Sequence, residues 1–148
     1  MRAVVTRVNS ATVRINGETV GSIGRGFLIL LGVHIDDTSE QCEKLCDKIL
    51  SLRIFEDDSG KMNRSLEDER GEVMVVSQFT LYGNCRRGRR PEFLKAARPE
   101  TAVPLYEMFV RRCRDRGFHT ETGVFGADMK VESINDGPVT LIIDTDEL

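Results

Sequence analysis

Two short segments carry the polar side chains whose types and spacing could support chemistry. In the first, Ser77-Gln78-Phe79-Thr80-Leu81-Tyr82-Gly83, a hydrophobic run ends in a hydroxyl, an amide and a second hydroxyl. Polar groups at the end of a core strand cost free energy unless they form hydrogen bonds, so they often mark a site. A strand that simply leaves the core for a loop gives the same pattern, and the segment alone does not decide between the two.

The second segment is Asn135-Asp136-Gly137-Pro138-Val139-Thr140, a Gly-Pro bend between two runs of alternating hydrophobicity. Glycine adopts backbone conformations that are closed to other residues, and proline removes an N–H donor and permits a cis peptide bond. Spacing alone indicates a tight bend between two strands.

Conventional catalytic groups are scarce. His34 and His119 lie in no nucleophile or metal motif, and we expect both to be structural or exposed. Cys42 and Cys46 are four residues apart, but no second pair of ligands accompanies them, so core packing is the better interpretation and we expect neither metal nor cofactor. The glycines of residues 21–26 lie between two predicted strands, which indicates a hairpin turn rather than a phosphate-binding loop.

Hydrophobic periodicity predicts the strands that must position these segments. Alternation over residues 12–15, followed by Asn16-Gly17, predicts a hairpin, and a second turn follows at residues 24–26. The unbroken apolar run at residues 27–31 fits a strand buried on both faces in the middle of a sheet. Residues 73–76 form a second run of this kind, directly before the first polar segment.

Two amphipathic helices are predicted in the same way. Asp37, with Glu40 three residues later, suits the N-cap of the first helix, and its apolar positions extend through residues 42–50. The second begins near Pro99, a residue favoured in the first helical turn, and ends near Gly117.

Composition limits the possible functions. A chain of 148 residues, 40% hydrophobic and 30% charged, is typical of one globular domain, and we predict a single compact α/β domain over residues 1–148: a mainly antiparallel or mixed β-sheet or β-roll with two principal helices. No window approaches the roughly 20 apolar residues needed to cross a bilayer, and no signal peptide is evident, so we expect a cytoplasmic protein with no membrane partner. The net charge of −3 argues against a generally basic nucleic-acid binder, and we expect no DNA partner.

Taken together, residues 77–81 and 135–140 resemble the two signature motifs of the D-aminoacyl-tRNA deacylase family, also described as D-tyrosyl-tRNA deacylases, at that family's separation. The resemblance covers essentially the whole chain, because further segments agree with it: residues 1–8, 53–56, 60–63, 88–91 and 125–129. It implies a homodimer that has its active sites at the subunit interface and acts on the acceptor end of aminoacyl-tRNA.

The resemblance also implies the reaction, which is hydrolysis of the ester bond of D-aminoacyl-tRNA to free D-amino acid and tRNA. A cis Gly137-Pro138 bond would project from one subunit into the active site of the other, where its carbonyls exclude an L side chain and admit a D side chain or hydrogen. Glycyl-tRNA, as mischarged on tRNA-Ala, would then be hydrolysed too. Arg7 would hydrogen-bond the Gly-Pro region and hold its geometry, although a carboxylate on a strand edge is an alternative partner.

The resemblance makes Ser77, Gln78, Phe79 and Thr80 the catalytic residues. A neighbouring ribose hydroxyl already activates the aminoacyl ester, so the enzyme mainly has to orient the ester and stabilise the oxyanion. Backbone N–H groups near Phe79 and Thr80 are the candidate donors. No histidine or carboxylate in the motif stands ready to activate Thr80 as a nucleophile, so we predict an orienting role for it.

Substrate contacts are expected from Asn135 and Met129. A local basic cluster just beyond the first motif is expected to contact the tRNA phosphates: Arg86, Arg87, Arg89 and Arg90. Four arginines of the second helix are expected to form its solvent-exposed face: Arg111, Arg112, Arg114 and Arg116. Glu92 and residues 84–86 depart from the commonest family pattern, which bears on tRNA affinity rather than on the reaction.

Two alternatives stay open. A related deacylase keeps the Gly-Pro pair in trans and accepts L-alanyl-tRNA, although Phe79 and Arg7 favour the D-selective branch. The other alternative is a tRNA-binding module without catalysis, but the aromatic residues near the basic cluster, Phe79, Tyr82 and Phe93, do not form the stacking pattern of an RNA-recognition sheet.

Overall fold

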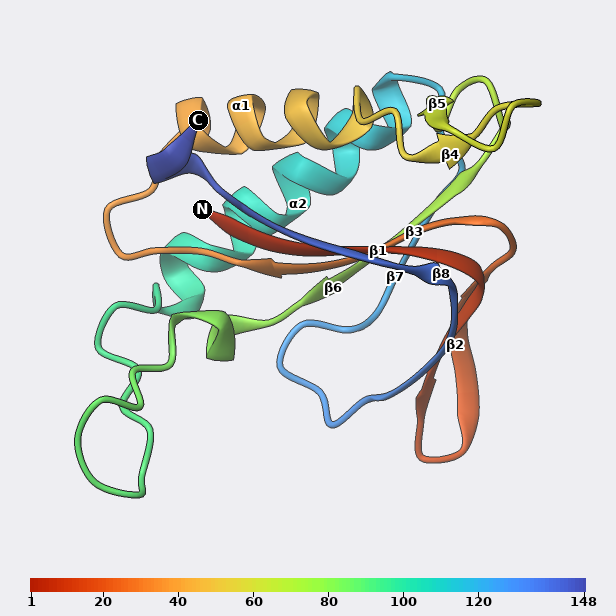
Figure 1. The fold of residues 1–148 in the computed structure, drawn as a ribbon. Coiled ribbons are helices and arrows are strands. Elements are labelled where there is room, and N and C mark those ends of the chain that lie inside the picture. The colour runs from red at the N-terminus through yellow and green to blue at the C-terminus, as the bar shows by residue number, and fades with distance from the viewer.

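Strands make up most of the regular structure, and both long helices lie on one side of the sheet (Figure 1). In the computed structural model, which describes residues 1–148, the strands are β1 (Arg2–Ile15), β2 (Glu18–Ile23), β3 (Gly26–Gly32), β4 (Phe55–Glu56), β5 (Met62–Arg64), β6 (Glu72–Ser77), β7 (Thr120–Thr122) and β8 (Lys130–Asp144). The helices are α1 (Ser39–Leu50) and α2 (Pro99–Asp115), with two 3-10 helices, η1 (Phe79–Tyr82) and η2 (Thr145–Glu147). No helix combines the length and apolarity that crossing a bilayer requires.

The sheet is mixed and nearly closed. Its path is β2-β1-β3-β6-β7, with β1 antiparallel to β2 and β3, and with β3, β6 and β7 parallel to one another. The curl of the sheet brings β2 against β7, where a Cβ on Gly21 would lie 2.7 Å from the Thr122 carbonyl oxygen, so only glycine fits. The predicted mixed sheet with two principal helices is confirmed.

The core is divided between the two faces of the sheet. Because side chains alternate along a strand, Phe27 and Ile29 face the helices while Leu28 faces the inside of the curl. The helix side holds the larger cluster, in which Phe27 stacks on Phe55 at 5.4 Å. The smaller cluster inside the curl includes Met74 of β6. The strand at residues 27–31 is therefore buried on both faces, as predicted.

The helix boundaries are close to the predicted ones, with one correction. The N-cap of α1 is Thr38, not Asp37, since the Thr38 hydroxyl accepts from the Glu40 N–H (3.3 Å) and the Gln41 side chain accepts from the Thr38 N–H (2.9 Å). Asp37 instead accepts a hydrogen bond from the His34 N–H at 2.6 Å and so ties the end of β3 to the helix start.

A second correction concerns the C-terminal strand. The two alternating runs do not form a pair of strands joined by a bend, because both belong to β8, which lies antiparallel along the edge of β1 opposite β3 and β2. Thr6 faces Thr140 and Val8 faces Asn135, so residues 136–139 bulge out opposite Arg7. The Gly-Pro segment is therefore a bulge in one continuous edge strand.

Candidate functional site

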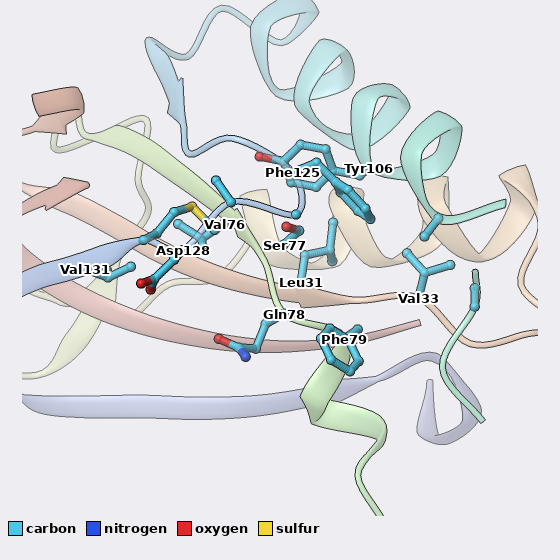
Figure 2. A pocket seen from close by; sticks show the side chains of 15 residues that line it. Leu31, Val33, Val76, Ser77, Gln78, Phe79, Tyr106, Phe125, Asp128 and Val131 are labelled. Atoms are coloured by element: carbon cyan, nitrogen blue, oxygen red, sulfur yellow. The ribbon is translucent and has the colours of Figure 1, made fainter. Parts of the chain in front are cut away.

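A cavity of about 330 Å³ opens at the C-terminal ends of the parallel strands β3 and β6 (Figure 2). Crevices at this end of parallel strands are frequent ligand sites. The lining is mostly apolar and comes from four places: Leu31 and Val33, residues 76–79, the start of α2 with Ala97, Ala102 and Tyr106, and residues 125–129 with Val131.

The backbone at one wall of the cavity leaves two hydrogen-bond donors free. The Gln78 N–H still bonds to the Leu31 carbonyl at 2.8 Å, and the chain then turns into η1. The first bond of that turn runs from the Leu81 N–H to the Gln78 carbonyl at 3.2 Å, so the N–H groups of Phe79 and Thr80 precede it and have no acceptor within the helix. Two adjacent donors are thus available to a ligand oxygen.

The side chains of this segment have different neighbours. Gln78 and Phe79 line the cavity beside Ser77 (Figure 2). Outside this lining, the Phe79 ring meets Phe93 edge-on at 5.1 Å. The Thr80 hydroxyl accepts a hydrogen bond from the Gln78 amide and does not line the cavity. No histidine or carboxylate contacts this hydroxyl, so nothing in the chain would activate it as a nucleophile.

Residues 125–129 form the opposite wall with α2. Phe125 meets Tyr106 edge-on at 6.0 Å, and Met129 and Asp128 border the same space (Figure 2). The Tyr106 hydroxyl donates to the Val75 carbonyl at 2.8 Å, and burial raises its pKa to about 12, so it stays protonated. The sequence indicated Met129 as a site residue but not Tyr106 or Phe125. Tyr106 is one aromatic residue among the apolar positions of a helix, and Phe125 is an aromatic residue before a glycine, and neither pattern points to a site.

The bulge of β8 forms a second group of predicted residues. Arg7 is 3% exposed, donates from Nε to the Asp136 carbonyl (2.9 Å) and from a terminal nitrogen to the Ile54 carbonyl (2.6 Å), and also has the Asp136 carboxylate at 3.4 Å. Arg7 therefore makes both contacts that the sequence left open, a hydrogen bond to the backbone beside Gly137-Pro138 and an ion pair with a carboxylate. The Gly137-Pro138 peptide bond is cis.

Two further features fix the shape of the bulge. The Asn135 amide oxygen accepts from the Val139 N–H at 3.0 Å, and its nitrogen donates to the Thr140 hydroxyl at 3.0 Å, so this side chain is engaged within the bulge. Gly137 has a φ of 134°, and a Cβ there would lie 2.8 Å from Val139 Cγ2 and 3.0 Å from an Arg7 nitrogen. No other residue would fit this position without strain.

The basic cluster occupies a third place. Its four arginines lie on a fully exposed loop that is closed by Asn84 and Glu92, which pair through their backbones and by a 2.7 Å side-chain hydrogen bond. Glu92 and Asn84, which both depart from the commonest family pattern, therefore contact each other. The hydrogen bonds from Leu94 and Asn84 hold the pKa of Glu92 below its usual range, which keeps this carboxylate charged at the loop base.

The structure thus brings some predicted residues together and separates others. Ser77, Gln78, Phe79 and Met129 share the cavity, whereas Arg7 and residues 135–138 lie at the bulge and do not line it. His34 is half-buried against Tyr82, and His119 is exposed beside Glu121.

The cysteines and acidic residues offer no metal centre. Across residues 1–148, no three histidine, cysteine, aspartate or glutamate side chains converge as ligands. Cys42 and Cys46 are buried in the helix-side core, and the Cys46 sulfur lies 3.7 Å from that of Cys113. Cys42 and Cys46 both belong to the helix-side core cluster, which confirms the core-packing interpretation for this pair, and burial raises the pKa of the Cys42 thiol to about 12.

Comparison with known proteins gives a consistent result. A sequence model of the family described as D-Tyr-tRNA(Tyr) deacylase matches residues 4–144. The chain is 58% identical over 147 residues to the D-aminoacyl-tRNA deacylase of Thermus aquaticus, covering 99% of this chain and 97% of that protein. It is 56% identical to the D-aminoacyl-tRNA deacylase of Thermotoga petrophila, covering 100% and 99%.

Solved structures of other proteins share the fold, and two of them illustrate the range of sequence identity. One, titled c-Myc DNA Unwinding Element Binding Protein, superposes with a TM-score of 0.91 at 42% identity, covering 97% of this chain and 98% of that one. The other, described as a probable eukaryotic D-amino acid tRNA deacylase, has a TM-score of 0.82 at 20% identity, covering 96% and 97%.

Proposed function

Because the chain belongs to the D-Tyr-tRNA(Tyr) deacylase family, whose members are ester hydrolases, we propose that it removes D-amino acids from tRNA at the cavity between η1 and α2. The observation that carries this proposal is the pair of N–H groups at Phe79 and Thr80 that have no acceptor in η1, beside a cavity in which no histidine or carboxylate is hydrogen-bonded to a hydroxyl. The one carboxylate of the lining, Asp128, pairs with Lys130 at 3.0 Å. Such a site can polarise an ester carbonyl without a covalent intermediate.

The proposed reaction is direct hydrolysis. Water attacks the ester carbonyl carbon while the two N–H groups stabilise the negative charge that develops on the carbonyl oxygen. The bond to the ribose oxygen then breaks, and that oxygen takes up the proton given up by the water, with the neighbouring ribose hydroxyl assisting. Gln78 and Ser77 orient the reacting ester, and Thr80 holds Gln78 through the hydrogen bond between their side chains.

The apolar part of the cavity suits the portion of the substrate that all tRNAs share. An enzyme that accepts many D-amino acids gains nothing from a pocket matched to one side chain, whereas the terminal nucleoside of the acceptor end is constant. Phe125 and Tyr106 offer faces and edges for a base, and Met129 adapts to its outline (Figure 2). We assign the substrate contact of Met129 to this base.

Chiral selection is proposed to come from a second copy of the chain. Gly137 and Pro138 are exposed and do not line the cavity of their own chain. They lie on β8, whose outer edge pairs with no strand and exposes Ile134 (59%) and Ile142 (73%). Val131 belongs both to this strand and to the cavity lining, so a second copy laid along β8 in a twofold arrangement brings its bulge to the cavity.

A mixing experiment tests this composite site. We expect Ala127→Phe, which fills the cavity, and Gly137→Ala, which distorts the bulge, each to be inactive. Co-refolded in equal amounts, they should recover about a quarter of wild-type activity, because half the dimers are mixed and each has one intact site. No recovery in mixed dimers would mean that each site belongs to a single chain.

The reaction itself is tested by hydrolysis of D-tyrosyl-tRNA and L-tyrosyl-tRNA by the purified protein in the presence of chelator. Release of only the D form is expected. Release of L-tyrosine or of L-alanine from its tRNA would show that the bulge does not exclude L side chains, and release of neither would favour a binding module. Glycyl-tRNA-Ala is expected to be hydrolysed as well, and duplex DNA is expected not to compete, as suits a cytoplasmic enzyme of translation.

The role of Thr80 needs its own variant. Thr80→Val keeps the backbone N–H and the side-chain shape but removes the hydroxyl that Gln78 contacts. Turnover should fall by less than about tenfold if the residue only orients Gln78. Complete loss of turnover with intact substrate binding would make Thr80 a chemical participant.

A further inference from the structure

A second cavity, of about 510 Å³, adjoins the first. It lies between α2 and residues 122–125 and shares Tyr106 and Phe125 with the first cavity. These two rings, in edge-on contact at 6.0 Å, line both spaces and so form the wall between them; Figure 2 shows them from the first cavity. A ligand seated in the first cavity can therefore extend across this wall along α2.

Four arginines of α2 were expected to form one exposed face, and the structure divides them. Arg112 and Arg116 pair with Asp47 of α1 at 2.7 and 3.2 Å and point away from the second cavity. Arg111 and Arg114 line the cavity instead. Three residues apart on one helix, they lie on the same helix face and line the same space.

The charges of these two arginines are not neutralised within the chain. Arg114 donates to the Thr120 carbonyl at 3.0 Å, which fixes its position without cancelling its charge. Arg111 forms no ion pair and no hydrogen bond, although the one acidic residue of the lining, Glu107, precedes it by a helical turn. The cavity therefore carries a net positive charge, and its apolar residues Val103 and Val124 give it a surface suited to a sugar or base.

We propose that this second cavity binds the phosphodiester on the 5′ side of the terminal nucleoside, with Arg111 as its ligand and Arg114 as a supporting charge. This inference rests on the proposed function, which seats the terminal nucleoside in the first cavity. A strand leaving that nucleoside over Phe125 and Tyr106 carries its first phosphate directly to α2. The planar guanidinium fork matches two phosphate oxygens, and a backbone contact of this kind is independent of tRNA sequence.

Two groups of arginines are candidates for phosphate contacts, and the sequence alone does not show which of them lies nearer the ester. The arginines at residues 86–90 lie on an exposed loop outside the two cavities, with Arg86 beside a different hollow next to Tyr82. They are placed to meet phosphates farther from the ester. Arg111 is placed to contact the phosphate nearest the ester, so replacing Arg111 should weaken binding even of very short substrates.

The test compares ligands that lack the 5′ phosphodiester with ligands that carry it. Binding of adenosine and of the trinucleotide CCA to the wild type and to Arg111→Gln is measured first, followed by hydrolysis of D-tyrosyl-adenosine and D-tyrosyl-tRNA. We expect Arg111→Gln to weaken CCA binding roughly fivefold and to flatten the log–log salt dependence by about 0.7. Adenosine binding and D-tyrosyl-adenosine hydrolysis should not change.

Two variants serve as controls. Arg116→Gln makes the same charge change at the C-cap of the same helix, outside the cavity, and should leave CCA binding unchanged. Arg111→Lys should retain most of the salt dependence. The inference is overturned if Arg111→Gln binds CCA as the wild type does, or if it weakens adenosine equally. Wild-type protein that binds CCA in a phosphate-dependent way but hydrolyses neither ester would refute the proposed function and leave the phosphate site standing.

Discussion

Replacing Arg7 by methionine tests whether one buried guanidinium holds the bulge of β8. Methionine keeps much of the packing of the side-chain stem but removes the donors to the Asp136 and Ile54 carbonyls. A hydrogen bond from a charged donor contributes roughly 1.5–3 kcal/mol, and the half-buried Asp136 carbonyl can regain water, so we expect Arg7→Met to lower the free energy of unfolding by about 3–4 kcal/mol. The released bulge should also discriminate less between D- and L-tyrosyl-tRNA.

Arg14→Met is the matched control on the same strand. Arg14 pairs with Glu132 at the surface, and an exposed ion pair contributes less than about 1 kcal/mol. Urea unfolding at one fixed protein concentration compares the two variants, and hydrolysis of both aminoacyl-tRNAs compares their selectivity. The reasoning fails if Arg7→Met loses no more stability than Arg14→Met, or if the folded Arg7 variant keeps the wild-type preference for the D form.

Three further predictions concern the scaffold. Tyr106→Phe removes the buried hydrogen bond to the Val75 carbonyl and should cost about 1–2 kcal/mol, seen as a lower melting temperature; an unchanged Tm would contradict this. The hydrogen bond from Arg112, with the charge of Arg116, holds the pKa of Asp47 below its ordinary value of 3.8, so the stability it provides is full above that value and is lost as pH falls through the lower folded pKa. Wild type should therefore lose its stability advantage over Asp47→Asn in urea unfolding as the pH is lowered below 3.8, whereas parallel curves would show that the ion pair contributes nothing. A thiol reagent should modify only Cys85 in the native protein and all four cysteines in denaturant, as counted by mass spectrometry; rapid native labelling of Cys46 or Cys113 would mean that the helix-side core opens.

Most of the fold was predictable from local sequence patterns. The hairpin at Asn16-Gly17 was predictable because both residues adopt a positive φ, of 50° and 81°, which few other pairs tolerate. That β8 is one continuous strand was not predictable, because hydrophobic alternation on both sides of a bend is the same in a hairpin and in a single bulged strand. Pairing of both runs with β1 decides between them, and that contact leaves no local signature. Thr38 and Asp37 are both good caps, but Asp37 is engaged by the local His34 N–H and by a tertiary partner, the N-terminal ammonium of Met1 at 2.6 Å, which the sequence does not indicate.

The site was predictable in part. The polar end of β6 and the family resemblance indicated residues 77–79, but Tyr106 lies on an apolar helix stripe and looks like any core residue until the segment ending at Met129 closes over it. The roles of the arginines on α2 also depend on tertiary contacts that the sequence does not show. Their spacing gives the helix face of each, but only the position of Asp47 on the neighbouring helix distinguishes neutralised charges from free ones.

The pairing of β1 with β8 also has a consequence for how the protein is made. Thr6 and Thr140, which face each other across these strands, are 134 residues apart in the chain. Closing so long a loop is entropically costly, and during synthesis the second edge of β1 stays open until residues 130–144 have left the ribosome. The bulge depends on that pairing, because it lies opposite Arg7 of β1 and accepts a hydrogen bond from that side chain. A chain whose cavity forms before residues 130–144 pair with β1 would lack the element proposed to exclude L-aminoacyl-tRNA, so selectivity for the D form is expected to be acquired only in the last stage of folding.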